Sequence, residues 1–226
     1  MAVSRSEDWM TMVNGSEPDN VSVPIGNGTN QMLVCIILRE RGTPYTVSEF
    51  SIGGSDYDYT ASVRLDSTPD LIIKAFFWDD ESIEEMTSSL STYTDDEGGA
   101  KIGYSFATYQ DVRQEEPTVG TGTTASGTYV DCSSTSTSND MLIGALIDKS
   151  ANRDPFDYDT LTERAEYGVD DFAIGIADGS GGDSSTRLSN DGTVSALAGM
   201  VITLQGFAVG AGRARGIMRG VGRGLN

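Results

Sequence analysis

The sequence predicts an all-β fold with two antiparallel sheets packed face to face, a jelly roll or a similar sandwich. Glycine occurs 27 times and serine and threonine are abundant, whereas segments rich in helix-forming residues are few and short. Short apolar segments recur at close spacing, separated by clusters of Gly, Asn, Asp, Ser and Thr. In most of them apolar and polar residues alternate, so we expect one covered and one solvated face on each sheet.

The first half of the chain contains one segment that is apolar at every position, MLVCIIL at residues 32–38. Its length and its branched residues favour a central, buried strand over a helix. After the aromatic segment 71–78, Ile83, Met86 and Leu90 follow at helical spacing behind several acids, which indicates a short helix within residues 79–90. The strands expected in this half are 21–25, 32–38, 46–52, 59–65, 71–78 and 101–109.

The second half repeats this apolar character at residues 140–147, which we interpret as a second central strand. No change of composition divides the chain, and no repeat with a period of 20–50 residues is present, which disfavours a solenoid or a propeller. We therefore expect ten to twelve strands in a single domain, residues 1–210, followed by a tail at 211–226. The strands expected in this half are 118–132, 140–147, 165–167, 172–176 and 197–209.

The chain is strongly acidic, with 34 Asp and Glu against 15 Lys and Arg and a net charge of −19. Such a protein repels itself at low ionic strength and is screened at high salt, which suits a halophilic or marine source. The alternative is an ordinary acidic protein. Because phosphate binding requires a basic surface, we expect no nucleic-acid partner for the folded body.

The last sixteen residues, AGRARGIMRGVGRGLN, have the opposite charge. They contain four arginines and no acid, and they offer little apolar surface for a core. We predict that this tail docks on an acidic protein neighbour, because guanidinium groups pair bidentately with carboxylates. The alternative is a disordered, solubilising tail. The predicted docking residues are Arg213, Arg215, Arg219 and Arg223.

Two cysteines are too few for a disulfide framework in a chain of this length. Cys35 lies in the apolar segment 32–38 and is expected to be a buried thiol, although a bridge to Cys132 is an open alternative. The first residues lack the apolar region of a secretory signal, and no apolar segment is long enough for a membrane helix. We therefore expect neither export by a signal peptide nor a membrane partner.

The absence of histidine excludes Ser-His-Asp and Cys-His catalysis and His-ligated zinc. A pair of carboxylates of the glycosidase type would occur by chance among 34 acids. The Gly-Gly pairs at 53–54 and 98–99 lack the Lys-Ser/Thr that follows in a phosphate-binding loop. We therefore predict that the protein is not an enzyme.

Acidic residues gather in three loops, at 56–58, 79–81 and 178–183. Oxygen-rich loops with glycine turns can coordinate calcium, and Asp178 and Asp183 of the third loop are the calcium candidates. No stretch matches the twelve-residue calcium-binding loop, so solvated loops without metal are the alternative, and we assign no required cofactor.

Five segments together resemble a jelly-roll domain that recurs in virion proteins of tailed viruses. An Asn-anchored turn leads into the first core strand, a hairpin ending in Gly-Gly follows, and a later strand precedes a loosened Val-Asp-Gln-x-x-Pro element, here DVRQEEP at 111–117. The resemblance covers residues 20–207, and its motifs are structural. The segments are GNGTNQMLVCIIL, TVSEFSIGG, LIIKAFFW, YSFATYQDVRQEEPTVGT and NDMLIGALI.

The resemblance implies a virion surface protein and carries over no catalytic residue. The leading interpretation is a capsid decoration or cement protein on the outer surface of the head, forming a homotrimer or another symmetric oligomer. One alternative is a tail-fibre or vertex adhesin that binds host-surface carbohydrate on an aromatic platform, and another is a single jelly-roll major capsid protein. The residues considered for the platform are Tyr57, Tyr59, Trp78 and Tyr93.

Overall fold

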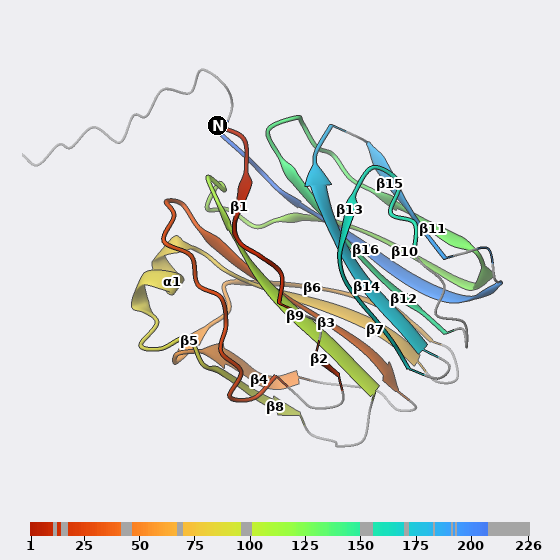
Figure 1. The fold of residues 1–226 in the computed structure, drawn as a ribbon, viewed down its shortest axis with the longest axis horizontal. Helices are drawn as coiled ribbons and strands as arrows, with labels where there is room; N and C mark the ends of the chain where they lie inside the picture. The colour runs from red at the N-terminus through yellow and green to blue at the C-terminus, as the bar shows by residue number, and fades with distance from the viewer. Residues whose placement is uncertain are drawn as a thin grey trace, which may run out of the picture.

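The computed structural model contains sixteen strands and one short helix in the part of the chain that it describes (Figure 1). That part comprises residues 1–10, 13–14, 18–41, 47–66, 70–95, 101–149, 156–169, 172–182, 184–190, 192 and 194–207. The elements are β1 Ser4–Glu7, β2 Val13–Asn14, β3 Met32–Arg41, β4 Val47–Ile52, β5 Ser55–Asp56, β6 Tyr59–Leu65, β7 Asp70–Trp78, α1 Asp80–Glu85, β8 Ser91–Asp95, β9 Lys101–Gln110, β10 Thr118–Gly127, β11 Tyr129–Ser133, β12 Met141–Asp148, β13 Thr162–Val169, β14 Phe172–Ser180, β15 Ser185–Ser189 and β16 Ser195–Leu204.

Two antiparallel sheets form the centre of the molecule. The first has the strand order β1-β9-β3-β7-β6, with β2 added beside β9, and the second has the order β10-β16-β12-β14-β13. The prediction of an all-β fold is confirmed, and the packed antiparallel sheets are compatible with the expected sandwich. The jelly-roll connectivity is not confirmed, because each central sheet is drawn from one contiguous half of the chain.

The two central sheets are built on the same plan. In chain order, β1, β3, β6, β7 and β9 of the first sheet take the same places as β10, β12, β13, β14 and β16 of the second. The register agrees as well, because Met32 pairs with Tyr109 and Met141 pairs with Leu204. The matching segments share a sequence pattern where the central strand begins, NQML at 30–33 and NDML at 139–142. The fold is therefore an internal duplication of a five-stranded unit.

The main core lies between the two central sheets. It contains alternate residues of β3 and β7 on one side and of β12 and β16 on the other, all buried. Along one side of this core, β6 packs against β10. The principal residues of the main core are Met32, Val34, Ile36, Leu38, Ile73, Phe77, Ile143, Ile147, Ile176, Met200 and Ile202.

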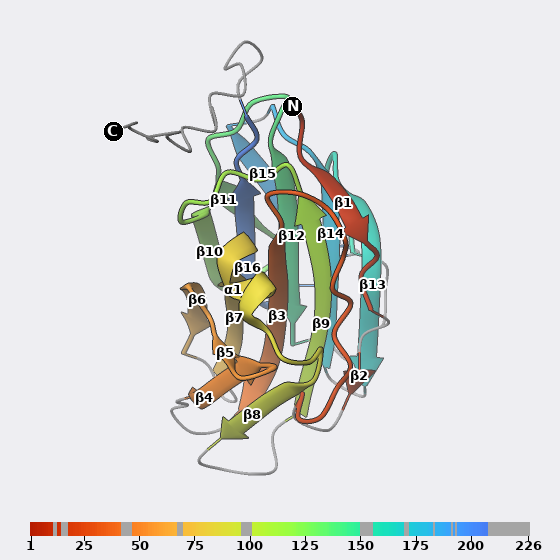
Figure 2. The ribbon, with the colours of Figure 1, turned by 90° about the vertical axis from the view of Figure 1, so that its left-hand side faces the viewer.

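Smaller layers cover the outer faces of both central sheets, so the molecule has four layers (Figures 1 and 2). The sheet β5-β4-β8 and helix α1 cover the first central sheet, and the ribbon β11-β15 covers the second. The expectation of one solvated face on each sheet is therefore wrong for the central strands. Residues 33, 35 and 37 of β3 are as buried as residues 34, 36 and 38, which explains why this segment is apolar at every position.

The predicted short helix is present as α1. Asp79 caps its N-terminus, because its carboxylate accepts a hydrogen bond from the Ser82 backbone nitrogen at 3.0 Å. Ile83 faces the outer core beside Trp78. None of the helical segments that the structure describes has the length and apolar character needed to cross a membrane.

Candidate functional site

A buried carboxylate, Asp178 of β14, connects the two halves of the molecule. Its Oδ2 accepts hydrogen bonds from Arg5 Nη1 at 2.7 Å, Trp9 Nε1 at 3.1 Å and the Tyr109 hydroxyl at 2.8 Å. Its Oδ1 accepts from Arg164 Nε at 2.5 Å. Arg5, Trp9 and Tyr109 belong to the first half, whereas Arg164 lies on β13 of the second half. We call these five residues the Asp178 network.

The Asp178 network has a structural role in this arrangement. Asp178 is 1 % exposed, and both of its oxygens are occupied by donors from the protein. Burial raises the pKa of the Tyr109 hydroxyl well above its usual value, and the neighbouring Asp178 charge raises it further. Asp178, one of the two calcium candidates, thus faces two guanidinium groups between the sheets, and Asp183 lies outside the described residues.

The four aromatic residues considered for a sugar platform do not share a surface. Trp78 and Tyr93 are 0 % and 3 % exposed and pack with Phe50 in the core between β4, β8 and the first central sheet. Tyr57 is 36 % exposed, and its ring contacts Phe76 edge-on. Tyr59 is half-buried against the main core. Two of the four therefore have no ring face open to a ligand.

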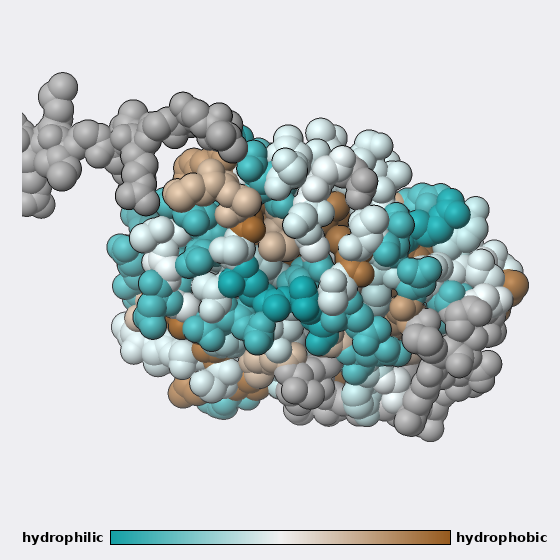
Figure 3. Space-filling model, turned by 45° about the horizontal axis from the view of Figure 1, so that its top comes forward, coloured by the Kyte–Doolittle hydropathy of each residue, from teal (hydrophilic) through white to brown (hydrophobic). Residues whose placement is uncertain are grey.

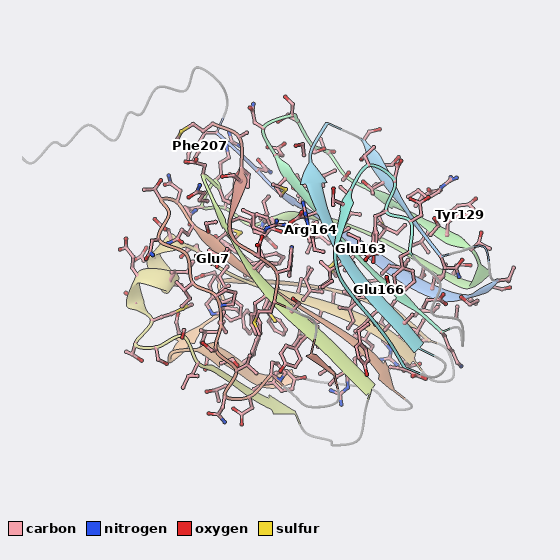
Figure 4. The ribbon with its side chains drawn as sticks, in the orientation of Figure 1. Glu7, Tyr129, Glu163, Arg164, Glu166 and Phe207 are labelled. Carbon is pink, nitrogen blue, oxygen red and sulfur yellow. The ribbon has the colours of Figure 1, made fainter. Side chains whose placement is uncertain are left out.

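The tail residues Arg213, Arg215, Arg219 and Arg223 lie outside the described part of the chain. The described chain ends at Phe207, whose carbonyl oxygen accepts a hydrogen bond from the Met1 amino group at 2.9 Å. Residue 1 and residue 207 thus meet at one end of the molecule, as Figure 2 shows for the N-terminus and Figure 4 for Phe207.

A polar hollow of about 290 Å³ lies on the outside of the β11-β15 ribbon. Along both strands the residues alternate between buried and exposed, which turns Asp131 and Arg187 outward. These two are cross-strand partners and form two hydrogen bonds, of 2.9 Å and 3.2 Å. The residues that line the hollow are Asp131, Asp157, Asp159, Ser185, Arg187 and Ser189.

An exposed aromatic ring lies beside this hollow. Tyr129 of β11 is 45 % exposed, and the Arg187 guanidinium lies over its ring, 4.0 Å from the centroid. The hydrogen bond from Arg187 lowers the pKa of the Asp131 carboxyl, so this group is ionised at neutral pH. Asp157 and Asp159 enter from the loop before β13, where the Asp157 carboxylate accepts from the Asp159 backbone nitrogen at 3.0 Å. The hollow thus combines an aromatic ring, hydroxyl groups, carboxylates and one guanidinium.

A pair of glutamates lies on β13, on the outer side of the second central sheet. A β-bulge between Glu163 and Ala165 shifts the register, so that Glu163 pairs with Ala177 and Glu166 pairs with Gly175. Partial burial and the Glu163 charge raise the pKa of Glu166 to about 7.

The phenol of Tyr158 lies close to the glutamate pair. Tyr158 is 3 % exposed, and its hydroxyl has no hydrogen-bond partner among the described residues. Burial raises its pKa well above the usual value, and the charges of Glu163 and Glu166 raise it further. The hydroxyl lies directly above Gly175, where a β-carbon would come within 1.8 Å of its oxygen.

Both cysteines are free and buried, on opposite sides of the molecule. Cys35 faces the core beneath β4 and β8, and Cys132 faces the core beneath the β11-β15 ribbon. Burial is the main cause that raises the pKa of Cys132 to about 12. Among the described residues, no group of three or more His, Cys, Asp or Glu side chains is arranged to hold a metal ion.

Sequence reasoning missed the hollow and the glutamate pair. Tyr129 follows a Thr/Gly-rich segment and Arg187 follows a Gly/Ser-rich segment, so no motif marks either residue. Comparisons of the chain with protein-family models, with curated proteins and with solved structures each found no match.

Proposed function

We propose that this chain is a non-enzymatic structural protein of a virus particle, a capsid decoration or cement protein held on the head by its C-terminal tail. The sequence resemblance to virion proteins of tailed viruses supports the class of protein. The same resemblance is the basis for proposing a relation to jelly-roll domains. The chain does not pass alternately from one central sheet to the other, because each central sheet takes its strands from one half of the chain.

The contrast in charge between the body and the tail carries this proposal. The whole chain has a net charge of −19, yet residues 211–226 contain four arginines and no acid. The described body ends at Phe207, beside Met1, at one end of the sandwich. A protein anchored at that end would present its opposite end and its acidic sides to solvent, and neighbouring particles would repel one another.

Assembly into a symmetric oligomer is part of the proposal. Strand β10 forms one edge of the second central sheet and contains no charged residue in ten positions. Charged residues are a usual means of preventing edge-to-edge pairing, and the edge strands β1, β6 and β13 all contain them. An uncharged edge on a strongly acidic body favours pairing with a second copy.

The test of docking is to remove the tail and measure rebinding to particles stripped of this protein. Deletion of residues 211–226 should reduce the bound copies by about tenfold or more, because the ion pairs that hold the tail are lost. A full-length variant with all four arginines replaced by serine should behave like the deletion, and raised salt should weaken the wild type. Full rebinding by the truncated protein would contradict the proposed docking.

A second candidate function is carbohydrate binding at the hollow beside Tyr129, as in a tail-fibre or vertex adhesin. The specific observation is the exposed Tyr129 ring next to carboxylates, a guanidinium and serine hydroxyls. Sugars combine apolar ring faces with hydroxyl groups, and these side chains offer both kinds of contact.

This second function can be tested with an array of cell-surface glycans. Substitution Tyr129→Ala should reduce binding of any glycan that the wild type retains by about tenfold. Leu90→Ala, at an exposed apolar residue that does not line the hollow, is the control and should bind as the wild type does. Equal loss in both variants, or no glycan retained by the wild type, would exclude the hollow as a sugar site.

A further inference from the structure

The outward residues of the β11-β15 ribbon face solvent, and the polar hollow lies on this face. Ser189 of β15 pairs with Tyr129 on one side and forms an isolated bridge with Asp157 on the other. Two main-chain hydrogen bonds of 2.9 Å, one in each direction, hold Asp157 beside Ser189. The chain at Asp157 therefore extends the ribbon by a third row, and Asp157 lines the hollow.

The turn that follows Asp157 places a second carboxylate at the hollow. The Asp159 backbone nitrogen donates to the Asp157 carboxylate at 3.0 Å, and the Leu161 backbone nitrogen donates to the Tyr158 carbonyl oxygen at 3.0 Å. Asp159 has a φ of 58°, in the left-handed region that Asp tolerates better than most residues. This turn therefore holds both carboxylates of one short loop at the same hollow.

The lining of the hollow carries more negative than positive charge. Among the described residues that line it, Asp131, Asp157 and Asp159 stand against a single guanidinium, that of Arg187. The hydrogen bond and the charge of Asp131 raise the pKa of Arg187, and the Asp159 charge adds to this effect. Three carboxylates can balance a second guanidinium as well. The hollow therefore favours a cationic group.

Arg187 shows how this surface holds a guanidinium. Its planar group lies over the Tyr129 ring, 4.0 Å from the centroid, and donates two hydrogen bonds to the Asp131 carboxylate. A guanidinium is more weakly hydrated than an ammonium group, and its fork of donors matches carboxylate oxygens. The hydroxyls of Ser185 and Ser189, which also line the hollow, are further acceptors. Arginine is therefore a better occupant than lysine.

The chain supplies such a group in its tail, residues 211–226, which contains four arginines and no acid. Figure 4 shows Phe207, where the described body ends, and Tyr129 toward opposite ends of the molecule. A glycine-rich chain of about 16 residues, the separation of Phe207 and Arg223 in the sequence, spans about 22 Å on average. A folded domain of this length is about 40 Å across. The hollow of a neighbouring copy is therefore easier for the tail to reach than the hollow of its own copy.

We propose that the hollow beside Tyr129 is the docking site for the arginine tail of a second copy of this chain. The inference rests on the docking role proposed for the tail and names its acidic neighbour, so that each copy is held on the particle through the next. An arginine of the tail pairs with Asp157 and Asp159, while Arg187 stays paired with Asp131. Because tail and hollow occupy different places on each copy, the contact is head-to-tail and generates a ring where it closes. An occupied hollow is closed to a sugar, so docking and the second candidate function exclude each other.

The test mixes two full-length variants, each of which lacks one side of the contact. The tail variant has all four tail arginines replaced by serine, and the hollow variant carries Asp157→Asn and Asp159→Asn. In about 50 mM salt, where charges are weakly screened, the wild type should associate in analytical ultracentrifugation. Each variant alone should associate about tenfold more weakly or not at all. Their equimolar mixture should form a one-to-one pair, because one intact tail meets one intact hollow.

A matched control removes the same number of charges from another surface. Glu84→Gln together with Glu85→Gln, at two exposed acids of α1, should associate as the wild type does. Asparagine at position 157 keeps the side-chain oxygen that accepts from the Asp159 nitrogen, so the hollow variant should keep the fold. Far-UV circular dichroism of each variant establishes this.

Three results would overturn the assignment of the hollow: a monomeric wild type in low salt, wild-type association of the hollow variant, or a mixture of the two variants that does not pair. The docking role of the tail is tested separately by rebinding to stripped particles. If the tail deletion fails to rebind while the hollow variant rebinds as the wild type does, the tail docks on another acidic surface and only the hollow is excluded. Full rebinding of the tail deletion would exclude both.

Discussion

At the scale of single residues, Asp178 is a buried carboxylate that joins donors from both halves of the molecule. Its carboxylate accepts four hydrogen bonds, and two of the donors are arginines whose side chains are 20 % and 31 % exposed. Removing one partner of a buried charge pair leaves the other charge uncompensated, which costs more than the pair itself contributes. The network fills the side of the sandwich where β1 faces β13.

We therefore expect Asp178→Asn to lower the free energy of unfolding by about 3 kcal/mol. The measurement is urea unfolding followed by tryptophan fluorescence, because Trp9 donates to this carboxylate. Asp131→Asn is the matched control, since Asp131 also pairs with an arginine but on the exposed ribbon, and it should change the unfolding midpoint little. Similar midpoints for Asp178→Asn and the wild type would show that the two arginines are satisfied without the carboxylate.

At the scale of elements, the sequence was enough to predict the strands with the longest apolar segments. It was not enough to predict the strands that cover the outer faces of the two central sheets. Residues 32–38 and 140–147 were expected as central strands, and they form β3 and β12. The ribbon strand β11 alternates between buried and exposed residues. Such alternation indicates a strand with one wet face, but it does not tell whether that strand belongs to a central sheet or covers one. The four-layer arrangement therefore required the structure.

The positions of the site residues followed from local irregularities that the sequence does not mark. Regular alternation would place Glu163 and Glu166 on opposite faces, and only the bulge at Ala165 brings them together. Asp178 precedes a glycine-rich stretch, which predicts a loop, yet β14 continues to Ser180 and turns this carboxylate inward. The duplication was visible only as the shared apolar character of two segments, because its period is far longer than that of common repeats.

At the scale of the whole molecule, the duplication accounts for the shape of the body and for its unequal edges. Strand β1 and strand β10 occupy the same place in their sheets, but β1 has four residues and β10 has ten. The face drawn in Figure 3 is mainly hydrophilic, with hydrophobic residues in small separate areas. Backbone pairing at a strand edge is a second route to association, and β10 is a long edge without charged residues.

This leads to a prediction about the oligomeric state. In about 1 M salt, where repulsion between acidic bodies is screened to a Debye length of about 3 Å, the wild type should sediment as a dimer or a larger symmetric oligomer. Thr123→Lys places a charge on the exposed edge of β10 and should weaken association by about tenfold or more. Thr92→Lys, at an exposed threonine of β8, introduces the same charge elsewhere and should associate as the wild type does. A monomeric wild type in analytical ultracentrifugation, or equal association of both variants, would mean that β10 stays unpaired and that assembly depends on other surfaces.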